Sequence, residues 1–386
     1  MPIARDFFQT FFALEIATNP WVLRDGLIFY LSRICGIDDA DAYLTSGVDI
    51  EAIHSEIALK LAEAERNPES FERILFSKAY TQLIFLFAAT LNDIENGPVS
   101  PGHLALARFL GPQDVILTFN WDMLMERALL QTGHWRVDDG YGVKPHSVFR
   151  DAWMDPVMPA SPSAPKIIKL HGSVNWLTAH PVYEGQELVL THGLPTESLF
   201  IYERATKPYS TFAGRYMDGY APLTYGYYPP NITNVPGRPV PEGHVIVRVR
   251  PKFPWIPEGG AEEAGVASMP LIIPPVREKS YGFFGTLFEM LWQKAEQALQ
   301  ACDEIVVIGY SFPRTDLRSH TLFTQAFMNR NSIPRVTIID PNPNRPAEIF
   351  SMDLGIPMTH LCVIEAPFEG EKTLQTLLRS ATGSSA

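Results

Sequence analysis

The first part of the chain carries apolar side chains at the spacing of amphipathic helices. In the segment 50–66, Ile and Leu recur every three or four residues and form one broad apolar stripe. The segment 71–94 is more apolar still, and Pro101 suits the first turn of a short helix ending at Leu110. We therefore expect residues 4–110 to form one helix after another.

After Gly111 and Pro112 the pattern changes to short, nearly continuous apolar runs, each followed by polar residues. Strands that are apolar on both faces are typical of a parallel sheet covered by helices. The amphipathic segment 284–299 provides a helix that crosses over between two such strands. The predicted fold is therefore α/β, with a doubly wound, mostly parallel, Rossmann-like sheet. The runs are 114–118, 166–170, 304–308 and 336–339, with 271–273 as a weaker fifth.

Between residues 178 and 269 this alternation stops. The stretch is rich in Pro, Gly and Tyr and is too long for an ordinary connection, so we interpret it as an inserted lobe or lid with short strands such as 244–249. The expected organisation is a helical region (1–110), the first half of the Rossmann-like core (111–177), the insert (178–269) and the second half of the core (270–386).

Composition narrows the class of protein. The net charge of −12 argues against nucleic-acid binding through bulk charge. The three cysteines lie far apart with no CxxC pair, which excludes a four-cysteine zinc site and a disulfide framework. The apolar run 83–91 is too short to span a bilayer, and the N-terminus lacks the pattern of a signal peptide. We expect a soluble, cytoplasmic protein that binds neither membranes nor nucleic acids directly.

Polar residues follow the predicted strands at the sheet edge where α/β folds bind ligands. A Gly-x-Ser turn suits close contact with a phosphate or ribose, and an acid after a later strand suits a ribose hydroxyl. The candidates are Thr118, Phe119, Asn120 and Asp122 after the first strand, His171 and Gly172 after the second, Gly309, Tyr310 and Ser311 after the third, and Asp340 and Asn342 after the fourth.

Each of these motifs also has a purely structural interpretation. Asp122 stands where it would cap the next helix, and His171 would bond to a neighbouring carbonyl. The segment 311–316 also reads as the cap of a following helix, and 340–343 as a turn. Taken singly, the motifs leave both interpretations open.

Together and in this order, the motifs resemble those of the sirtuin-like family, over residues 114–177 and 271–342. The resemblance implies that the first motif lines the nicotinamide-ribose pocket of NAD and that the histidine acts as a base on the ribose. The catalytic residues would be Asn120, Asp122 and His171. The cofactor-binding residues would be Thr118, Phe119, Asn120, Asp122, Gly309, Tyr310, Ser311, Asp340 and Asn342.

The chain departs from the protein-deacylating sirtuins after the histidine. Those proteins carry two CxxC pairs that form a zinc ribbon, whereas here no cysteine follows His171 until Cys302. In this respect the chain is similar to metal-free prokaryotic antiphage defence effectors that hydrolyse NAD, often as oligomers or with a partner ATPase or Argonaute. The resemblance implies NAD as substrate, no metal, and a homo-oligomer.

A second departure lies at the start of the chain. The family opens with a strand and a Gly-Ala-Gly-x-Ser loop, and the segment 1–8 looks like the piece that follows that loop. The sheet then lacks a central strand and the diphosphate lacks a glycine-rich cradle, so we expect Met1 to be an internal start of a longer protein.

Three functions remain open from the sequence. The first is NAD⁺ hydrolysis to nicotinamide and ADP-ribose. The second is deacylation or ADP-ribosyl transfer with the insert as an acceptor-binding lobe, and the third is a non-catalytic module that binds NAD or ADP-ribose.

Overall fold

The structure is a computed structural model. It describes residues 4–14, 17, 24–64, 71–95, 97–150, 153–159, 164–179, 199–203, 233–235, 238–239, 245–248, 265–274, 286–313, 316–369 and 375. Most of the predicted insert lies outside these residues.

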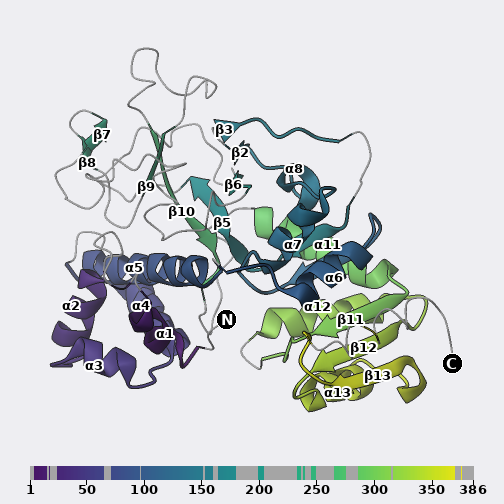
Figure 1. Cartoon of the computed structure of the whole chain (residues 1–386). Helices are drawn as coiled ribbons and strands as arrows, with labels where there is room; N and C mark the ends of the chain where they lie inside the picture. Colours follow the sequence, from purple (N-terminus) through teal and green to yellow (C-terminus); the bar gives the residue numbers. More distant parts are fainter. Residues whose placement is uncertain are drawn as a thin grey trace.

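The predicted N-terminal helical region is confirmed, and Figure 1 shows its first five helices gathered on one side of the molecule. The long helix α5 packs against α2 and α4. Ser100 caps the last helix by accepting a hydrogen bond from the His103 amide, with Pro101 in its first turn. The helices are α1 (Phe7–Ala13), α2 (Asp25–Arg33), α3 (Ala40–Thr45), α4 (Ile50–Ala64), α5 (Phe71–Ile94) and α6 (Pro101–Phe109).

The four main predicted strands are present and parallel, but in the described residues they lie in two sheets and not in one. The first sheet pairs β1 (Val115–Thr118) with β4 (Lys166–Lys169). The second has the order β11 (Glu304–Ile308), β12 (Arg335–Asp340), β13 (Leu361–Glu365). The connecting helices are α7 (Leu124–Thr132), α8 (Val137–Gly140), α11 (Leu287–Ala301), α12 (Leu317–Met328) and α13 (Asn344–Glu348), followed by a π-helical turn at Ile349–Asp353 and a 3-10 turn at Met358–His360.

Strands β1 and β11 each form an edge of their sheet within the described residues. Their apolar side chains are accordingly less covered than those of a central parallel strand, with Val115 41% and Val306 39% exposed. The coarse prediction of an α/β protein with parallel strands is therefore confirmed.

A third, mostly antiparallel sheet was not predicted. The run 271–273 was expected in the parallel sheet, which is wrong: residues 271 and 272 end β10, which is antiparallel to β5. The predicted short strand at 244–249 is confirmed as β9. The sheet order is β3 (Trp153–Met154), β2 (Ser147–Phe149), β6 (Leu199–Tyr202), β5 (Gly172–Ala179), β10 (Gly265–Ile272), β9 (Val245–Arg248), and β7 (Thr233–Val235) pairs with β8 (Arg238–Pro239) elsewhere.

This sheet lies between two apolar cores, because successive side chains of a strand point to opposite faces. In β6, Phe200 and Tyr202 pack into the core of the N-terminal helices. Leu199 and Ile201 of the same strand pack into the core of the parallel sheets and α11. Burial on both faces explains why 271–273 is continuously apolar although its strand is antiparallel.

Among the described residues, no helix combines the length and apolar character needed to cross a membrane.

Candidate functional site

The imidazole of His171 lies inside a cluster of aromatic rings, two residues after the end of β4. The ring centroids of Phe119 and Trp121 are 5.4 Å and 5.9 Å from that of His171, and Trp292 of α11 is 6.3 Å away. The His171 side chain is only 4% exposed. This surrounding fixes the position of the ring and removes it from bulk water.

The two nitrogens of His171 face different groups. Nδ1 lies 3.2 Å from the backbone carbonyl oxygen of Phe119. Nε2 lies 3.5 Å from Oδ2 of Asp316, whose side chain is 3% exposed. Because a carbonyl only accepts hydrogen bonds, a hydrogen bond at this position requires the proton to be on Nδ1, which leaves Nε2 facing the carboxylate of Asp316. The arrangement is chemically that of an acid–base pair.

The loop after β1 is tied to the start of β5 and the end of β10. The indole Nε1 of Trp121 donates to the carbonyl of Ile273 at 2.9 Å, and the amide of Val174 donates to the carbonyl of Trp121 at 2.9 Å. Next to this loop, the amide of Leu170 donates to Thr118 O at 3.0 Å. These bonds hold residues 119–121 against His171.

At Gly172 the backbone of another strand comes so close that only glycine fits. The sequence had left open whether this glycine allows a turn or the close approach of a ligand. Its φ of +80° is in the left-handed region, and a Cβ added there would lie 2.0 Å from the carbonyl oxygen of Leu271. The neighbouring His171 carbonyl accepts from the Ile273 amide at 2.9 Å. Gly172 therefore lets the end of β10 pack against the start of β5.

The turn after β11 meets the loop after β1. The ring of Tyr310 stacks on that of Phe119, with centroids 4.2 Å apart and an angle of 11° between the planes. The Tyr310 hydroxyl donates to Oδ2 of Asp316 at 3.3 Å. Gly309 has a φ of +63°, and Ser311 is exposed on the same turn. The first, second and third predicted motifs thus come together, as the sequence indicated.

The first motif also has the structural role that the sequence left open. Thr118 Oγ1 accepts from the Asn120 amide at 3.1 Å. Oδ1 of Asp122 accepts from the amide of Leu124, the first residue of α7, at 3.1 Å. The Asn120 side chain is exposed beside the buried histidine. Within this motif, Asn120 is therefore the residue whose side chain is best placed to meet a ligand.

Asp340 and Asn342 lie one strand further from His171. Oδ1 of Asp340 accepts from the Asn342 amide at 2.6 Å, which is the turn chemistry that the sequence allowed. They adjoin the turn after β11 through a backbone hydrogen bond from Gly309 to Ile339. Asp340 is 8% exposed and Asn342 is exposed, so Asn342 is the more accessible of the two.

A buried ion pair between Lys169 and Glu126 lies next to the site. Lys169 Nζ donates to Oε1 of Glu126 at 2.7 Å and also to the backbone carbonyl of Asp122. The two side chains are 1% and 2% exposed. Burial raises the pKa of the Glu126 carboxyl above its usual range, and the ammonium group of Lys169 opposes that rise. The pair links β4 to the start of α7.

The polar network continues away from the ion pair. The Tyr141 hydroxyl donates to Glu126 at 3.3 Å and accepts from Nδ2 of Asn175 at 3.0 Å. Asn175 in turn accepts from Ser173 Oγ at 2.6 Å. Buried polar groups that satisfy one another in this way specify a single arrangement of the surrounding strands.

Sequence reasoning assigned Asp316 only to a helix cap and did not single out Lys169 or Trp292. The cap is confirmed, because Oδ1 of Asp316 accepts from the Ser319 amide at 3.4 Å, but Oδ2 faces His171. Only the position of Lys169 inside an apolar strand signalled its burial.

Among the described residues, no group of three or more His, Cys, Asp or Glu side chains is arranged to hold a metal ion. The expectation that the site uses no metal stays a prediction. A scan against protein-family models and a search of curated proteins find no match to this chain.

Proposed function

We propose that this chain is a sirtuin-like NAD⁺ hydrolase that cleaves NAD⁺ to nicotinamide and ADP-ribose. The observation that carries the proposal is the junction of three motifs around one histidine. Nδ1 of His171 bonds to the Phe119 carbonyl, which places the ring beside Asn120, and Nε2 faces Asp316. The motifs belong to separate segments of the chain, and a shared crevice for one dinucleotide explains why they converge.

The proposed reaction breaks the bond between the nicotinamide nitrogen and C1′ of the ribose. Positive charge develops on the sugar, so oriented oxygen atoms and exclusion of stray water lower the barrier. Water adds its oxygen to C1′ and releases one proton, while nicotinamide leaves with the bonding electron pair.

The chain's own residues have distinct roles in this proposal. The amide of Asn120 positions the ribose and the attacking water, and Asp122 supports the charge on the sugar. His171 Nε2 receives the proton, and Asp316 stabilises the resulting imidazolium at 3.5 Å. Asp316 is then a positioning residue, because it acts through the histidine.

We also propose that the two parallel sheets belong to one doubly wound, Rossmann-like core. The stacking of Phe119 on Tyr310 supports this, because it joins the carboxyl ends of β1 and β11. The predicted role as a prokaryotic antiphage effector, the homo-oligomer and a partner ATPase or Argonaute rest on the family resemblance alone.

The test is to incubate the purified chain with NAD⁺ and to measure nicotinamide and ADP-ribose by chromatography. We expect His171→Ala and Asn120→Ala to abolish nicotinamide release, and the exposed His134→Ala to retain it. Circular dichroism checks that each variant is folded. Wild-type turnover by His171→Ala would refute the assignment.

The same assay separates the alternatives. Nicotinamide release that requires an acyl-lysine peptide or a protein acceptor would indicate deacylation or ADP-ribosyl transfer. Binding of ADP-ribose in a calorimeter without any turnover of NAD⁺ would indicate a non-catalytic module.

A further inference from the structure

A second site lies at the opposite end of the first parallel sheet from His171. A cavity of about 540 Å³ is lined by the first residues of β1 and β4, Val115 and Lys166, and by Lys294 of α11. His171 follows the other end of β4, five residues from Lys166, which corresponds to roughly 16 Å of strand. The cavity is therefore separate from the candidate active site.

The lining of this cavity is positively charged although the chain as a whole is acidic. Among the described residues it contains Lys144, Lys166 and Lys294 and one carboxylate, that of Asp139. The chain has a net charge of −12, so an excess of two positive charges in one cavity is a local feature. Such a charge excess selects anions.

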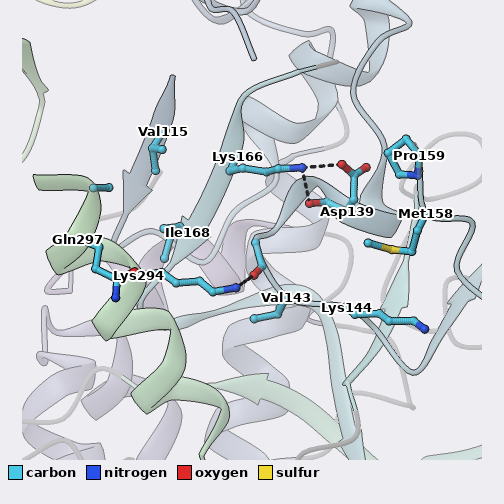
Figure 2. A pocket seen from close by; sticks show the side chains of 12 residues that line it. Val115, Asp139, Val143, Lys144, Met158, Pro159, Lys166, Ile168, Lys294 and Gln297 are labelled. Atoms are coloured by element: carbon cyan, nitrogen blue, oxygen red, sulfur yellow. Dashed lines mark hydrogen bonds and ion pairs between the residues drawn. The ribbon is translucent and has the colours of Figure 1, made fainter. Parts of the chain in front are cut away.

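Two of these ammonium groups are held by short contacts with the segment 139–142. Lys166 Nζ donates to Oδ2 and to the backbone carbonyl of Asp139, at 2.5 Å and 3.0 Å. Lys294 Nζ donates to the carbonyl of Gly142. Figure 2 shows both lysines reaching toward this segment from β4 and α11, whereas Lys144 extends away from them.

The charge of Lys294 is not balanced by a carboxylate within the described contacts. Its hydrogen bond to Gly142 uses one of its three N–H donors. Lys166, in contrast, already faces Asp139 in an ion pair. Lys294 is therefore the cation best placed to receive an added anion, with Lys166 and Lys144 adding attraction.

Apart from the amide of Gln297, the rest of the described cavity wall is apolar. Val115, at the edge of its sheet and 41% exposed, lines the cavity together with Ile168 and Val143. Met158 and Pro159 cover the opposite side. Apolar surface of this kind favours the body of an organic ligand over an isolated ion.

We infer that this cavity binds a small organic phosphate, with the phosphate on Lys294 and the apolar body against Val115. A dianion matches the excess of two positive charges in the lining. The inference does not rest on the proposed hydrolase activity, because none of its residues lies at the His171 site.

The experiment is calorimetric titration of the purified chain with phenyl phosphate, beside inorganic phosphate and phenol. We expect saturable binding of phenyl phosphate that is at least about tenfold tighter than binding of either control, since only phenyl phosphate offers both the charge and the apolar body.

Variants locate the site. Lys294→Gln should weaken phenyl phosphate binding at least about tenfold, the loss of one charge-assisted contact. Lys144→Gln, at an exposed position that tolerates substitution, should weaken it about threefold. Lys60→Gln, on the distant helix α4, should leave binding unchanged.

Three outcomes would overturn the inference. The first is unchanged affinity in both Lys294→Gln and Lys144→Gln. The second is loss of phenyl phosphate binding in His171→Ala, which would place the ligand at the other site. Equal affinity for inorganic phosphate and phenyl phosphate would reduce the site to adventitious ion binding and would also contradict it.

Discussion

Replacing Lys169 by methionine should strongly destabilise the protein, because it leaves the Glu126 carboxylate buried without its cation. The two groups are 2.7 Å apart and at most 2% exposed. Removing one partner of such a pair costs about 3–5 kcal/mol. The variant also loses the hydrogen bond from Lys169 to the carbonyl of Asp122.

The loss in the free energy of unfolding can be calculated, because the variant removes the buried negative charge by protonating Glu126. Burial already raises the pKa of Glu126, and without Lys169 the carboxyl stays protonated in the folded state. Protonating a carboxyl of reference pKa near 4.3 at pH 7 costs about 3.7 kcal/mol. The folded variant then binds one more proton than the unfolded chain, so its stability falls as the pH rises above about 4.3. Relative to the wild type, the deficit should be smaller at pH 5 than at pH 7, because protonating the unpaired carboxyl costs less at the lower pH.

Urea unfolding followed by circular dichroism at pH 5 and pH 7 measures the loss in the free energy of unfolding and its change with pH. The matched control is Lys60→Met, because Lys60 is partly exposed and its nitrogen is 3.9 Å from Glu56. Its expected effect is below about 0.5 kcal/mol. Lys169→Met combined with Glu126→Leu should recover most of the stability, because an apolar pair carries no buried charge. A deficit in Lys169→Met that equals the control, or that does not change between the two pH values, would refute the reasoning.

The remaining predictions concern single positions. Gly172→Ala should cost at least about 2 kcal/mol in urea unfolding, because its Cβ meets the carbonyl of Leu271, whereas Gly36→Ala, with a similar φ and open space, should cost about 1 kcal/mol. Burial lowers the pKa of His54 to about 3, so the wild type should lose up to about 1.4 kcal/mol per pH unit as the pH falls from 6.5 toward 3. His54→Leu should flatten that slope, and an unchanged slope would contradict the burial. Asp316→Asn should keep the helix cap but lower nicotinamide release at least about tenfold, and full activity would exclude its role beside the histidine.

The elements of the fold were more predictable than their arrangement. Strands β11 and β12 and helix α5 have strong local patterns, and they form close to the predicted boundaries. Strand β13 was missed although residues 361–364 form a continuous apolar run like those of the predicted strands; in the structure it is a partly exposed edge strand. The sequence could not predict whether β10 is parallel or antiparallel to its neighbours, because a short run buried on both faces has the same apolar pattern in both kinds of sheet.

The candidate site was predictable where neighbouring residues carry the signal. The convergence of Phe119, His171 and Tyr310 followed from their places at the ends of strands. The contact of His171 with Asp316 did not, because it spans more than a hundred residues and Asp316 already had a local explanation as a helix cap. For a residue such as Asp316, the sequence pattern reveals the partner that is close along the chain and not the one that is distant along it.

The exposed valines of β1 and β11 have a consequence for how the molecule behaves in concentrated solution. Each marks a strand whose outer row of amide and carbonyl groups has no neighbouring strand within the described residues. Such rows accept an additional strand from any chain that offers one, and nature usually guards them with lysine or proline. Each of these two edges can therefore pair with a strand of another chain, unless the other parallel sheet covers it in the single core proposed above.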